Sequence, residues 1–448
     1  MGLMEKRKKL LNQNRLKLFC TEKNYYLYDA YSQNIYPVNK ICANFFSMKK
    51  NEYSDDEENQ LLAKCDFLLK WDGKIKYVET DVCHLTINLS NKCNLNCTYC
   101  YREKNNKFEM NEEVVKEILT YAKSIYMPNA KEIVSSMNLT SEPLLELDKL
   151  KRIKAFYKDF EDKNTFLTMW FMSNGTILTD ESIQFIKDLK ISPFWISLDG
   201  PDFVHNKHRK YYDNRNSYED VINNINLLKI NNIKVRISCV ITRNYPFPDK
   251  LFDFFKTLEI DSIQMTPVRN GLPESISEQA LNEIKIGYSN IFDKICNEVL
   301  NDDFSSIRLL RDDILMSTFK NIFQRVRQSS RCTWGKEIVI DSKGDIYPCL
   351  YVINNQKFKL GNIRENKNSA EILFPITVNQ RKKCSKCWGR FLCGGTCHYN
   401  SISLGKTEFD VDEIECEIRY FLIEESLKRL IYLMEKKCNL TVFSKSLI

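Results

Sequence analysis

The 448-residue sequence has no run of eighteen or more apolar residues, so a membrane span is not expected. Its basic first segment, Met1–Leu11, is followed neither by an apolar stretch nor by a small-residue cleavage site, so a secretory signal is not expected either. We therefore expect a cytoplasmic protein without a membrane partner. The formal charge of +7 is not gathered into one Lys/Arg block, and neither terminus has a basic, aromatic-rich domain. This distribution argues against a nucleic-acid partner and agrees better with an acidic peptide.

The 17 cysteines need an explanation other than disulfides, which rarely persist in the cytoplasm. Ten of them fall into two tight arrays, and clustered cysteines in such a protein indicate metal or cluster ligands. The other seven are scattered singly and are expected to pack in cores: Cys20, Cys42, Cys65, Cys83, Cys239, Cys296 and Cys438.

An alternation of strands and helices begins near residue 80. The strand candidates are apolar and β-branched on both faces, as buried parallel strands are: Val82–Leu89, Glu132–Asn138, Thr165–Met172, Phe194–Leu198, Val235–Thr242 and Ser262–Pro267. Helical patterns lie between them at Glu112–Ile125, Leu144–Phe160, Asp180–Leu189, Tyr218–Ile230 and Asp249–Leu258. Six such units predict an α/β fold built on a partial (β/α)6 barrel of the TIM type.

The sequence divides into five predicted segments. Residues 80–275 form the barrel, and residues 1–79 predict a small α+β module that precedes it. Residues 276–330 predict a helical linker, 331–420 an irregular domain rich in Cys and Gly, and 421–448 a C-terminal helix and tail. The elements of the first module are expected at Leu16–Cys20, Tyr25–Asp29 and Asn34–Val38 for strands, and at Lys40–Lys49 and Asp55–Trp71 for helices.

The first cysteine array, Cys93, Cys97 and Cys100, follows the first barrel strand directly. Three thiolates can hold three irons of a 4Fe–4S cluster and leave the fourth iron open, although a zinc site is an alternative. Chemistry in α/β barrels gathers at the carboxyl ends of the strands. Distinctive polar segments follow the next three strands there, namely Asn138–Pro143, Met172–Thr176 and Ile196–Pro201.

This arrangement resembles the radical S-adenosylmethionine (SAM) superfamily. Its signature is C-x3-C-x2-C with an aromatic residue before the last cysteine, here Tyr99. The resemblance implies that SAM chelates the open iron and is cleaved to a 5′-deoxyadenosyl radical, which removes hydrogen from an unreactive carbon. The cofactor carries this chemistry, and the protein positions it.

The same resemblance implies a set of SAM contacts. Glu142 matches the glutamate of the G-G-E-P motif and would bind the SAM ammonium, although Thr140 and Ser141 replace the two glycines. Asn174 and Ser197 match strand-end positions that hold the SAM ribose or methionine. Arg209 matches an arginine that pairs with the SAM carboxylate. Each residue also has a structural alternative. Glu142 could cap the helix that begins at Pro143, and Asn174 could stabilise a turn. Ser197 could pack within its strand, and Arg209 could be a solvated surface charge.

The second array has its own spacing. It runs Cys332-x11-Gly344-x4-Cys349, then Cys384-x2-Cys387-x5-Cys393-x3-Cys397, and finally Cys416. A zinc ribbon is the rival interpretation, but seven cysteines fit no simple set of four-thiolate zinc sites.

The pattern resembles the SPASM domain, which implies two auxiliary 4Fe–4S clusters and three clusters in total. One would be held by Cys384, Cys387, Cys393 and Cys416, and the other by Cys332, Cys349 and Cys397. Anaerobic sulfatase-maturating enzymes carry a further cysteine just upstream, which Gln324–Arg331 lacks; the preceding thiol is Cys296. We therefore predict an iron that is free to bind a substrate thiolate.

SPASM-bearing radical SAM enzymes mostly modify peptides and proteins. The resemblance therefore predicts a peptide maturase that crosslinks a ribosomally made precursor peptide, with a Cys thioether as the expected bond. The order of elements in residues 1–79 resembles a winged-helix leader-recognition domain, although this module could instead be a stabilising cap over the side of the barrel. An electron donor such as flavodoxin or ferredoxin is expected, and no catalytic base is identified. The alternatives are a formylglycine-forming sulfatase-maturating enzyme, an RNA-modifying radical SAM enzyme and a non-enzymatic metal-binding module.

Overall fold

The computed structural model describes residues 14–47, 60, 82–102, 108–126, 131–137, 139–161, 166–324, 326–353, 355–365 and 372–447. Within these ranges no helix combines the length and the apolar character that crossing a membrane requires. Cys65 lies outside the described residues. The predicted helix Asp55–Trp71 lies outside them too, except for Gln60.

Parallel strands form the barrel in two sheets. Strands β4, β5 and β6 belong to one sheet, and β7 to β10 form the other, in the order β10-β9-β8-β7. Their bounds are β4 Val82–Ile87, β5 Glu132–Met137, β6 Phe166–Trp170, β7 Met172–Ser173, β8 Phe194–Ser197, β9 Val235–Ile241 and β10 Ser262–Pro267. The α/β partial barrel predicted from the sequence is confirmed.

One predicted strand is divided. The expected strand Thr165–Met172 is broken at Phe171, so that β6 pairs with β5 and β7 pairs with β8. The Phe171 ring is fully buried and packs edge-on against the ring of Phe194, with 5.5 Å between the centroids. The chain therefore passes from one sheet to the other at a core residue, and the barrel remains open between the two sheets.

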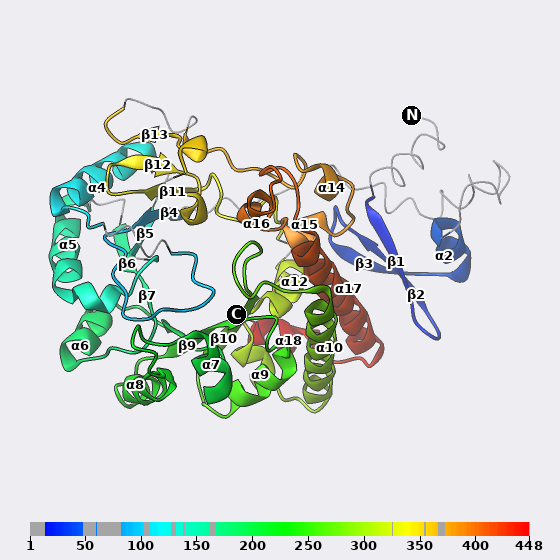
Figure 1. Cartoon of the computed structure of the whole chain (residues 1–448). Coiled ribbons are helices and arrows are strands. Elements are labelled where there is room, and N and C mark those ends of the chain that lie inside the picture. The colour runs from blue at the N-terminus through cyan, green and yellow to red at the C-terminus, as the bar shows by residue number, and fades with distance from the viewer. Residues whose placement is uncertain are drawn as a thin grey trace.

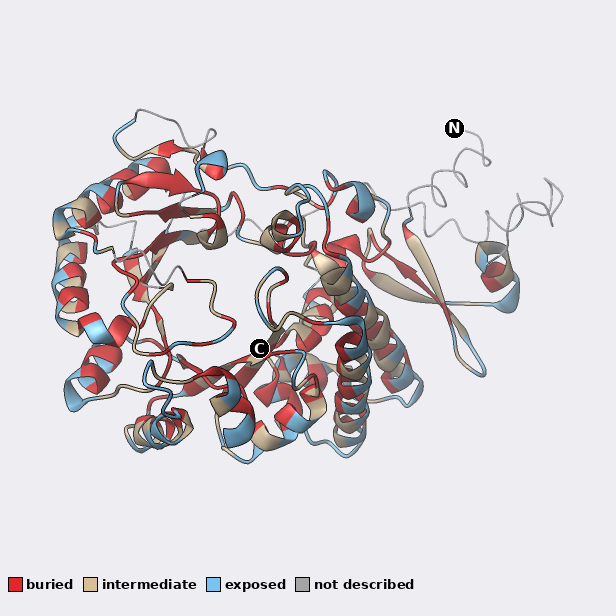
Figure 2. Cartoon of the chain, viewed as in Figure 1, coloured by how far each residue is buried: buried red, intermediate tan, exposed pale blue. Residues whose placement is uncertain are grey.

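Helices cover the outer side of the strands, and their buried faces turn toward the sheets (Figures 1 and 2). They are α4 Glu112–Tyr126, α5 Leu147–Phe160, α6 Asp180–Asp188, α7 Asp202–His208, α8 Tyr218–Ile230 and α9 Pro248–Lys256. Helix α4 illustrates the cause: its buried residues recur at the helical period, as Val115, Ile118, Leu119, Ala122 and Ile125.

The first part of the second cysteine array extends one sheet of the barrel. Strand β11, Glu337–Ile340, pairs in parallel with β4, and β12, Asp345–Tyr347, and β13, Gly361–Asn362, continue the same sheet. The turn between β11 and β12 contains Gly344 at φ +82°, where a Cβ atom would come within 2.9 Å of Ile363. This glycine belongs to the predicted cysteine pattern, and its backbone conformation explains why glycine stands there.

Further helices connect and cover the C-terminal part. They are α10 Glu278–Leu300, α11 Ser305–Leu309, α12 Ile314–Phe323, α14 Lys382–Ser385, α15 Arg390–Cys393, α16 His398–Ser403, α17 Glu413–Glu435 and α18 Leu440–Ser446. Helix α17 packs against α10 and α12. One apolar core therefore runs from the barrel strands into α17.

The N-terminal module contains β1 Leu16–Cys20, β2 Tyr25–Asp29, β3 Asn34–Val38 and α2 Lys40–Ser47, and its three strands have the predicted bounds. It lies beside α17, at the far end of the molecule from α4 to α6 (Figure 1). The rings of Phe19 and Tyr28 contact Trp388 edge-on at 6.1 and 5.8 Å. Burying each large aromatic side chain contributes roughly 1.5–3 kcal/mol. The module therefore packs on the C-terminal domain through these rings.

Candidate functional site

The loop that carries the first cysteine array is held by backbone hydrogen bonds to the end of α7. The N–H of Asn96 donates to the carbonyl of Lys210 at 2.7 Å, and the N–H of Thr98 donates to the carbonyl of His208 at 3.0 Å. The Thr98 hydroxyl also pairs with Nδ1 of His208 at 2.8 Å. His208, the last residue of α7, therefore helps to shape the cysteine loop.

The three thiols of the first array lie close enough to affect one another. Burial raises the pKa of Cys97 to about 11, with Arg209 acting in the opposite direction and the charges of Cys100 and Cys93 acting in the same direction as burial. Burial also raises the pKa of Cys93, with smaller contributions from Glu142 and Cys100. The predicted ligand set is therefore assembled at the carboxyl end of β4, beside Glu142.

Glu142 is completely buried at the end of β5. Its carboxylate accepts hydrogen bonds from the N–H of Asn174 at 2.6 Å, from the N–H of Leu144 at 3.1 Å and from the hydroxyl of Ser173 at 2.9 Å. Burial raises its pKa to about 7, while these hydrogen bonds act in the opposite direction. The bond to Leu144 caps the short helix Pro143–Glu146, so the capping alternative is correct. The capping hydrogen bond engages one carboxylate oxygen of Glu142, and the carboxylate still lies near Cys93.

Asn174 joins the end of β7 to the cysteine loop. Its amide nitrogen donates to Oδ1 of Asn94 at 2.8 Å and lies 3.8 Å from the sulfur of Cys93. Its amide oxygen accepts hydrogen bonds from the N–H and hydroxyl of Thr176 at 2.9 and 2.7 Å. Asn174 therefore also stabilises a turn, as its structural alternative predicts. Ser197 is buried at the last position of β8. Asn94 and Thr176, which the sequence did not single out, complete this network.

Arg209 is buried, so the alternative of a solvated surface charge is wrong. Its Nε donates to the carboxylate of Asp199 at 3.0 Å, and its guanidinium carbon lies 5.5 Å from the ring centre of Tyr99. The Tyr99 hydroxyl donates to the same carboxylate. Asp199, in the polar segment after β8, is the partner that sequence reasoning missed. The pairing of Arg209 with a SAM carboxylate stays a prediction.

The thiols of the second array lie in two groups, and the clusters that these groups would hold stay a prediction. Burial raises the pKa of Cys349 well above its usual range, and the charges of Cys332 and Cys397 add to this effect. Burial likewise raises the pKa of Cys416 to about 12, with contributions from the three remaining cysteines of the array, Cys393, Cys384 and Cys387. The structure therefore forms one group of three thiols and one group of four.

These buried thiols can act as ligands only as thiolates. A buried thiol with a raised pKa becomes a thiolate only beside strong positive charge, which bound iron supplies. Around one zinc ion all ligands lie about 2.3 Å from a shared centre. Among the described residues no group of three or more His, Cys, Asp or Glu is placed to hold a metal ion.

Tyrosine rings in contact connect the first array to the three-thiol group. Tyr101 and Tyr351 have ring centroids 4.2 Å apart, and Tyr351 and Tyr399 have centroids 4.9 Å apart. Burial raises the pKa of Tyr101 well above its usual range, and the charges of Cys100 and Cys349 act in the same direction. Tyr101 therefore lies between cysteines from the two arrays. No spacing in the sequence indicated this contact.

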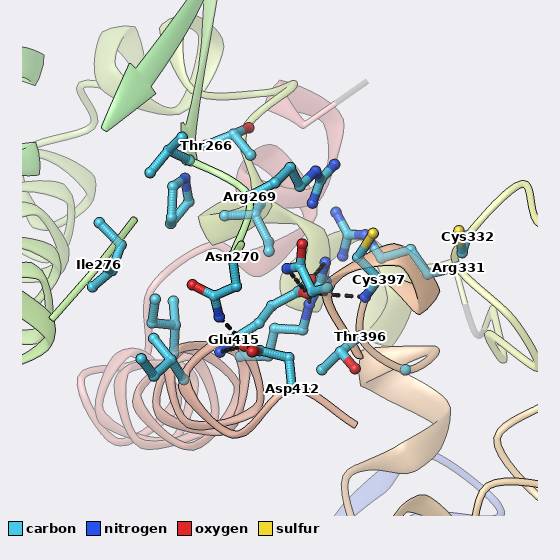
Figure 3. Close-up of a pocket in the computed structure, with 18 of the residues that line it drawn as sticks. Thr266, Arg269, Asn270, Ile276, Arg331, Cys332, Thr396, Cys397, Asp412 and Glu415 are labelled. Atoms are coloured by element: carbon cyan, nitrogen blue, oxygen red, sulfur yellow. Dashed lines mark hydrogen bonds and ion pairs between the residues drawn. The ribbon is translucent and has the colours of Figure 1, made fainter. Parts of the chain in front are cut away.

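A cavity of about 260 Å³ opens beside the three-thiol group. It is bounded by the end of β10 and the following residues on one side and by the C-terminal domain on the other (Figure 3). Cys332 and Cys397 line it, together with Arg269, Arg331 and Glu415. A molecule in this cavity would contact two of the three thiols and the strand end at once.

Family models identify the class of enzyme to which this barrel and its cysteine-bearing loop belong. Residues 87–253 match the radical SAM superfamily. Residues 332–388 match SPASM, an iron–sulfur cluster-binding domain. The chain is therefore an enzyme with a radical SAM domain and a C-terminal SPASM domain, and these domains imply 4Fe–4S clusters and SAM as cofactors.

Curated relatives cover most of the chain. A cysteine-type anaerobic sulfatase-maturating enzyme of Clostridium novyi (strain NT) is 26% identical over 360 residues, which span 77% of this chain and 94% of that protein. A serine-type anaerobic sulfatase-maturating enzyme of Bacteroides thetaiotaomicron is 25% identical over 355 residues, with 69% and 81% covered.

Two solved structures share the fold. The anSMEcpe structure with bound AdoMet has a TM-score of 0.65 at 21% identity and covers 82% of this chain and 98% of its own. Streptococcus suis SuiB bound to the precursor peptide SuiA has a TM-score of 0.51 at 14% identity, with 90% and 98% covered. At these identities the likeness supports the fold alone.

Proposed function

We propose that this enzyme modifies a cysteine of a peptide or protein substrate and joins its sulfur to a substrate carbon as a thioether. The observation that carries the proposal is the placement of the three-thiol group, since Cys332 and Cys397 both line a cavity at the end of β10. A 4Fe–4S cluster on Cys332, Cys349 and Cys397 would have an iron without a protein thiolate, and a soft substrate thiolate suits such an iron.

The first array and its neighbours would hold the radical-generating cofactor. When bound there, SAM and its cluster supply a carbon-centred radical that removes hydrogen from an unreactive carbon. Cys93, Cys97 and Cys100 would bind the irons. The buried Glu142 carboxylate, with its pKa near neutrality, would become fully ionised beside the SAM ammonium. Asn174, Ser197, Arg209 and Tyr99 would orient SAM.

Thioether formation balances without an oxygen donor. The new bond joins carbon and sulfur, the C–H and S–H bonds are broken, and two hydrogens leave the peptide. One hydrogen goes to the deoxyadenosyl group, and the other leaves as a proton and an electron. The auxiliary clusters are a suitable first acceptor for this electron. An external carrier such as flavodoxin or ferredoxin would supply electrons to the first array.

Formylglycine formation is the second candidate, and the curated relatives favour it. Both relatives described above are named as anaerobic sulfatase-maturating enzymes, one of cysteine type and one of serine type. That reaction would oxidise a cysteine side chain to an aldehyde, with loss of sulfur as sulfide and gain of oxygen from water. Gln324–Arg331 carries no further cysteine to complete the three-thiol group, which favours the thioether reaction.

The N-terminal module is the proposed contact for a precursor peptide. Its sheet has the order β1-β2-β3, so β1 and β3 are edge strands, and an extended leader could add to one of them. The sheet is anchored on the C-terminal domain through Trp388. A ribosomally made peptide held there is the substrate that this arrangement suits.

Mass spectrometry of a cysteine-containing candidate peptide would test the proposal. The peptide would be incubated anaerobically with reconstituted enzyme, SAM and a reductant, with a Cys93/Cys97/Cys100→Ala triple variant as control. A thioether retains sulfur and removes two hydrogens, and deoxyadenosine appears only with the active enzyme. Loss of sulfur with aldehyde reactivity would establish the formylglycine reaction instead. Deoxyadenosine without any change in the peptide would refute this choice of substrate.

A further inference from the structure

The cavity beside the three-thiol group is lined by three arginines from different parts of the chain. Arg269 follows β10, Arg331 directly precedes Cys332, and Arg419 lies on α17. Figure 3 shows Arg269 and Arg331 extending toward Cys397 from opposite sides of the cavity. Guanidinium groups in a partly enclosed site attract carboxylate groups, which they can bind through two parallel hydrogen bonds.

The carboxylates that line this cavity are already engaged by protein donors. Glu415 accepts two hydrogen bonds from Arg419, at 2.8 and 2.5 Å, and two more from the N–H of Cys397 and the amide of Asn400, both at 2.9 Å. A carboxylate has about four acceptor positions, so Glu415 has none to spare. Asp412 accepts the N–H of Glu415 at 2.6 Å and the amide of Asn270.

The guanidinium groups, in contrast, retain unused donors. Nη1 of Arg419 is buried without a hydrogen-bond partner in the part of the chain that the structure describes. Arg331 donates to the hydroxyl of Ser317 at 3.0 Å. Burial, together with the charge of Arg419, lowers the pKa of Arg331 to about 10. The guanidinium carbon of Arg269 lies 5.6 Å from the ring centre of Tyr351. The cavity wall therefore carries more positive charge than its own carboxylates neutralise.

We propose that this cavity binds a carboxylate of the substrate, from an Asp or Glu side chain close to the modified residue, and that Arg269 and Arg331 hold it. The inference rests on the proposed function and deepens it, because it names the chemistry of the peptide. The peptide would have two anchors, a thiolate on the open iron and a carboxylate on the arginines. An acidic substrate also agrees with the formal charge of +7.

The rival explanation is that the arginines compensate the charge of the clusters. Cys397 acts on the pKa of Arg269, and Cys393 acts on those of Arg331 and Arg419, so all three arginines lie near cluster ligands. This explanation predicts that removing an arginine shifts the midpoint potential of an auxiliary cluster and leaves peptide affinity unchanged. The two explanations therefore differ in a binding measurement that involves no turnover.

The experiment uses reconstituted holoenzyme with SAM and without reductant, so that peptide binding is measured by calorimetry in the absence of reaction. The probes are acetylated, amidated pentapeptides Gly-Xaa-Ala-Zaa-Gly, with Cys or Ser at the first variable position and Asp or Asn at the second. The proteins are wild type, Arg269→Gln, Arg331→Gln and Arg243→Gln. Arg243 is the control because it is an exposed arginine paired with Glu274, away from the cavity. Iron content and absorption spectra verify that each variant is loaded and folded.

We expect the Cys/Asp peptide to bind wild type and Arg243→Gln at least about tenfold more tightly than the Cys/Asn peptide. In Arg269→Gln or Arg331→Gln this ratio should fall below about threefold. Equal binding of Asp and Asn peptides to wild type overturns the inference, as does a ratio unchanged in both arginine variants. Failure of every peptide to bind at about 5 mM overturns it too, since charge-assisted pairing should be measurable there.

The two variable positions separate this inference from the proposed function. If Asp peptides bind more tightly than Asn peptides while Cys and Ser peptides bind equally, the carboxylate site is supported and the thiolate anchor is contradicted. If Cys is preferred over Ser while Asp and Asn bind equally, the thiolate anchor stands and the carboxylate site falls.

Discussion

The ring of Tyr101 lies 4.2 Å from the ring of Tyr351. Tyr101 directly follows Cys100 of the first array, and Tyr351 lies two residues after Cys349 of the second. The hydroxyl of Tyr101 donates to the carbonyl of Leu139 at 3.0 Å, which fixes the ring. Two loops that each carry cysteines of an array are therefore joined through a half-buried aromatic contact, and the contact helps to set the position of one array relative to the other.

Replacing Tyr351 with Leu should weaken the contact between the two cysteine-bearing loops. The variant loses ring contacts to Tyr101 and Tyr399, and an aromatic pair contributes about 0.5–1.5 kcal/mol beyond its buried area. We expect a lower thermal midpoint and reduced iron content after reconstitution, while Tyr351→Phe, which keeps the ring, should remain close to wild type. Differential scanning fluorimetry and iron analysis measure both effects. Equal losses in the Leu and Phe variants would assign the effect to the hydroxyl instead.

Glu142 should make the SAM-free protein less stable as the pH rises. Burial raises the pKa of this carboxyl from 4.5 to about 7, so the folded state retains a proton that the unfolded state has lost. The stabilisation from the protonated form is complete below pH 4.5 and declines between pH 4.5 and pH 7. A shift of this size corresponds to about 3 kcal/mol.

The test compares thermal unfolding of wild type and Glu142→Gln without SAM at about pH 5 and pH 8. The neutral amide has no such pH dependence, so the variant should gain stability relative to wild type at the higher pH. Other titrating groups affect both proteins and cancel in the difference. Parallel pH profiles would show that Glu142 titrates near its ordinary pKa.

Residue pattern predicted the parts of the fold and site that depend on local spacing. The parallel strands bury alternate residues, as β5 and β9 do, and their apolar residues are visible in the sequence. The two ligand sets of the second array were implied by the resemblance to the SPASM domain. Phe171 shows the limit: a residue within one apolar run directs the chain into a second sheet, because its packing against Phe194 is a contact between strands. Periodicity along the chain carries no information about that contact.

The polar partners of the site were harder to predict for the same reason. Asp199 stood in a segment already considered important, but its pairing with Arg209 and Tyr99 depends on how α7 returns to the strand end. The three arginines of the cavity are separated in sequence by 62 and 88 residues, from Arg269 to Arg331 and from Arg331 to Arg419. Only the junction between barrel and C-terminal domain brings them together.

Asp199→Asn should destabilise the protein strongly. Asp199 is fully buried, and removing its charge leaves the buried Arg209 guanidinium without a counter-charge. Breaking a buried pair in this way costs roughly 3–5 kcal/mol. Asp213→Asn is the matched control, because it removes a carboxylate from an exposed Asp–Arg pair with Arg215, and its thermal midpoint should stay at that of wild type. Similar midpoints for both variants would mean that Arg209 reaches solvent or another anion.

Single Cys→Ala substitutions should separate the two auxiliary groups. Cys349→Ala removes a ligand of the three-thiol group, and we expect one cluster, about four irons, to be lost from the reconstituted protein. Cys384→Ala should lose the other cluster and leave the first in place, because the two groups are distinct in space. Cys296→Ala, a buried cysteine on α10 outside both groups, should keep the full iron content. Iron and sulfide analysis with Mössbauer spectroscopy gives the number and type of clusters. Loss of both clusters from Cys349→Ala would contradict separate ligand sets, and loss of iron from Cys296→Ala would identify that thiol as the missing fourth ligand.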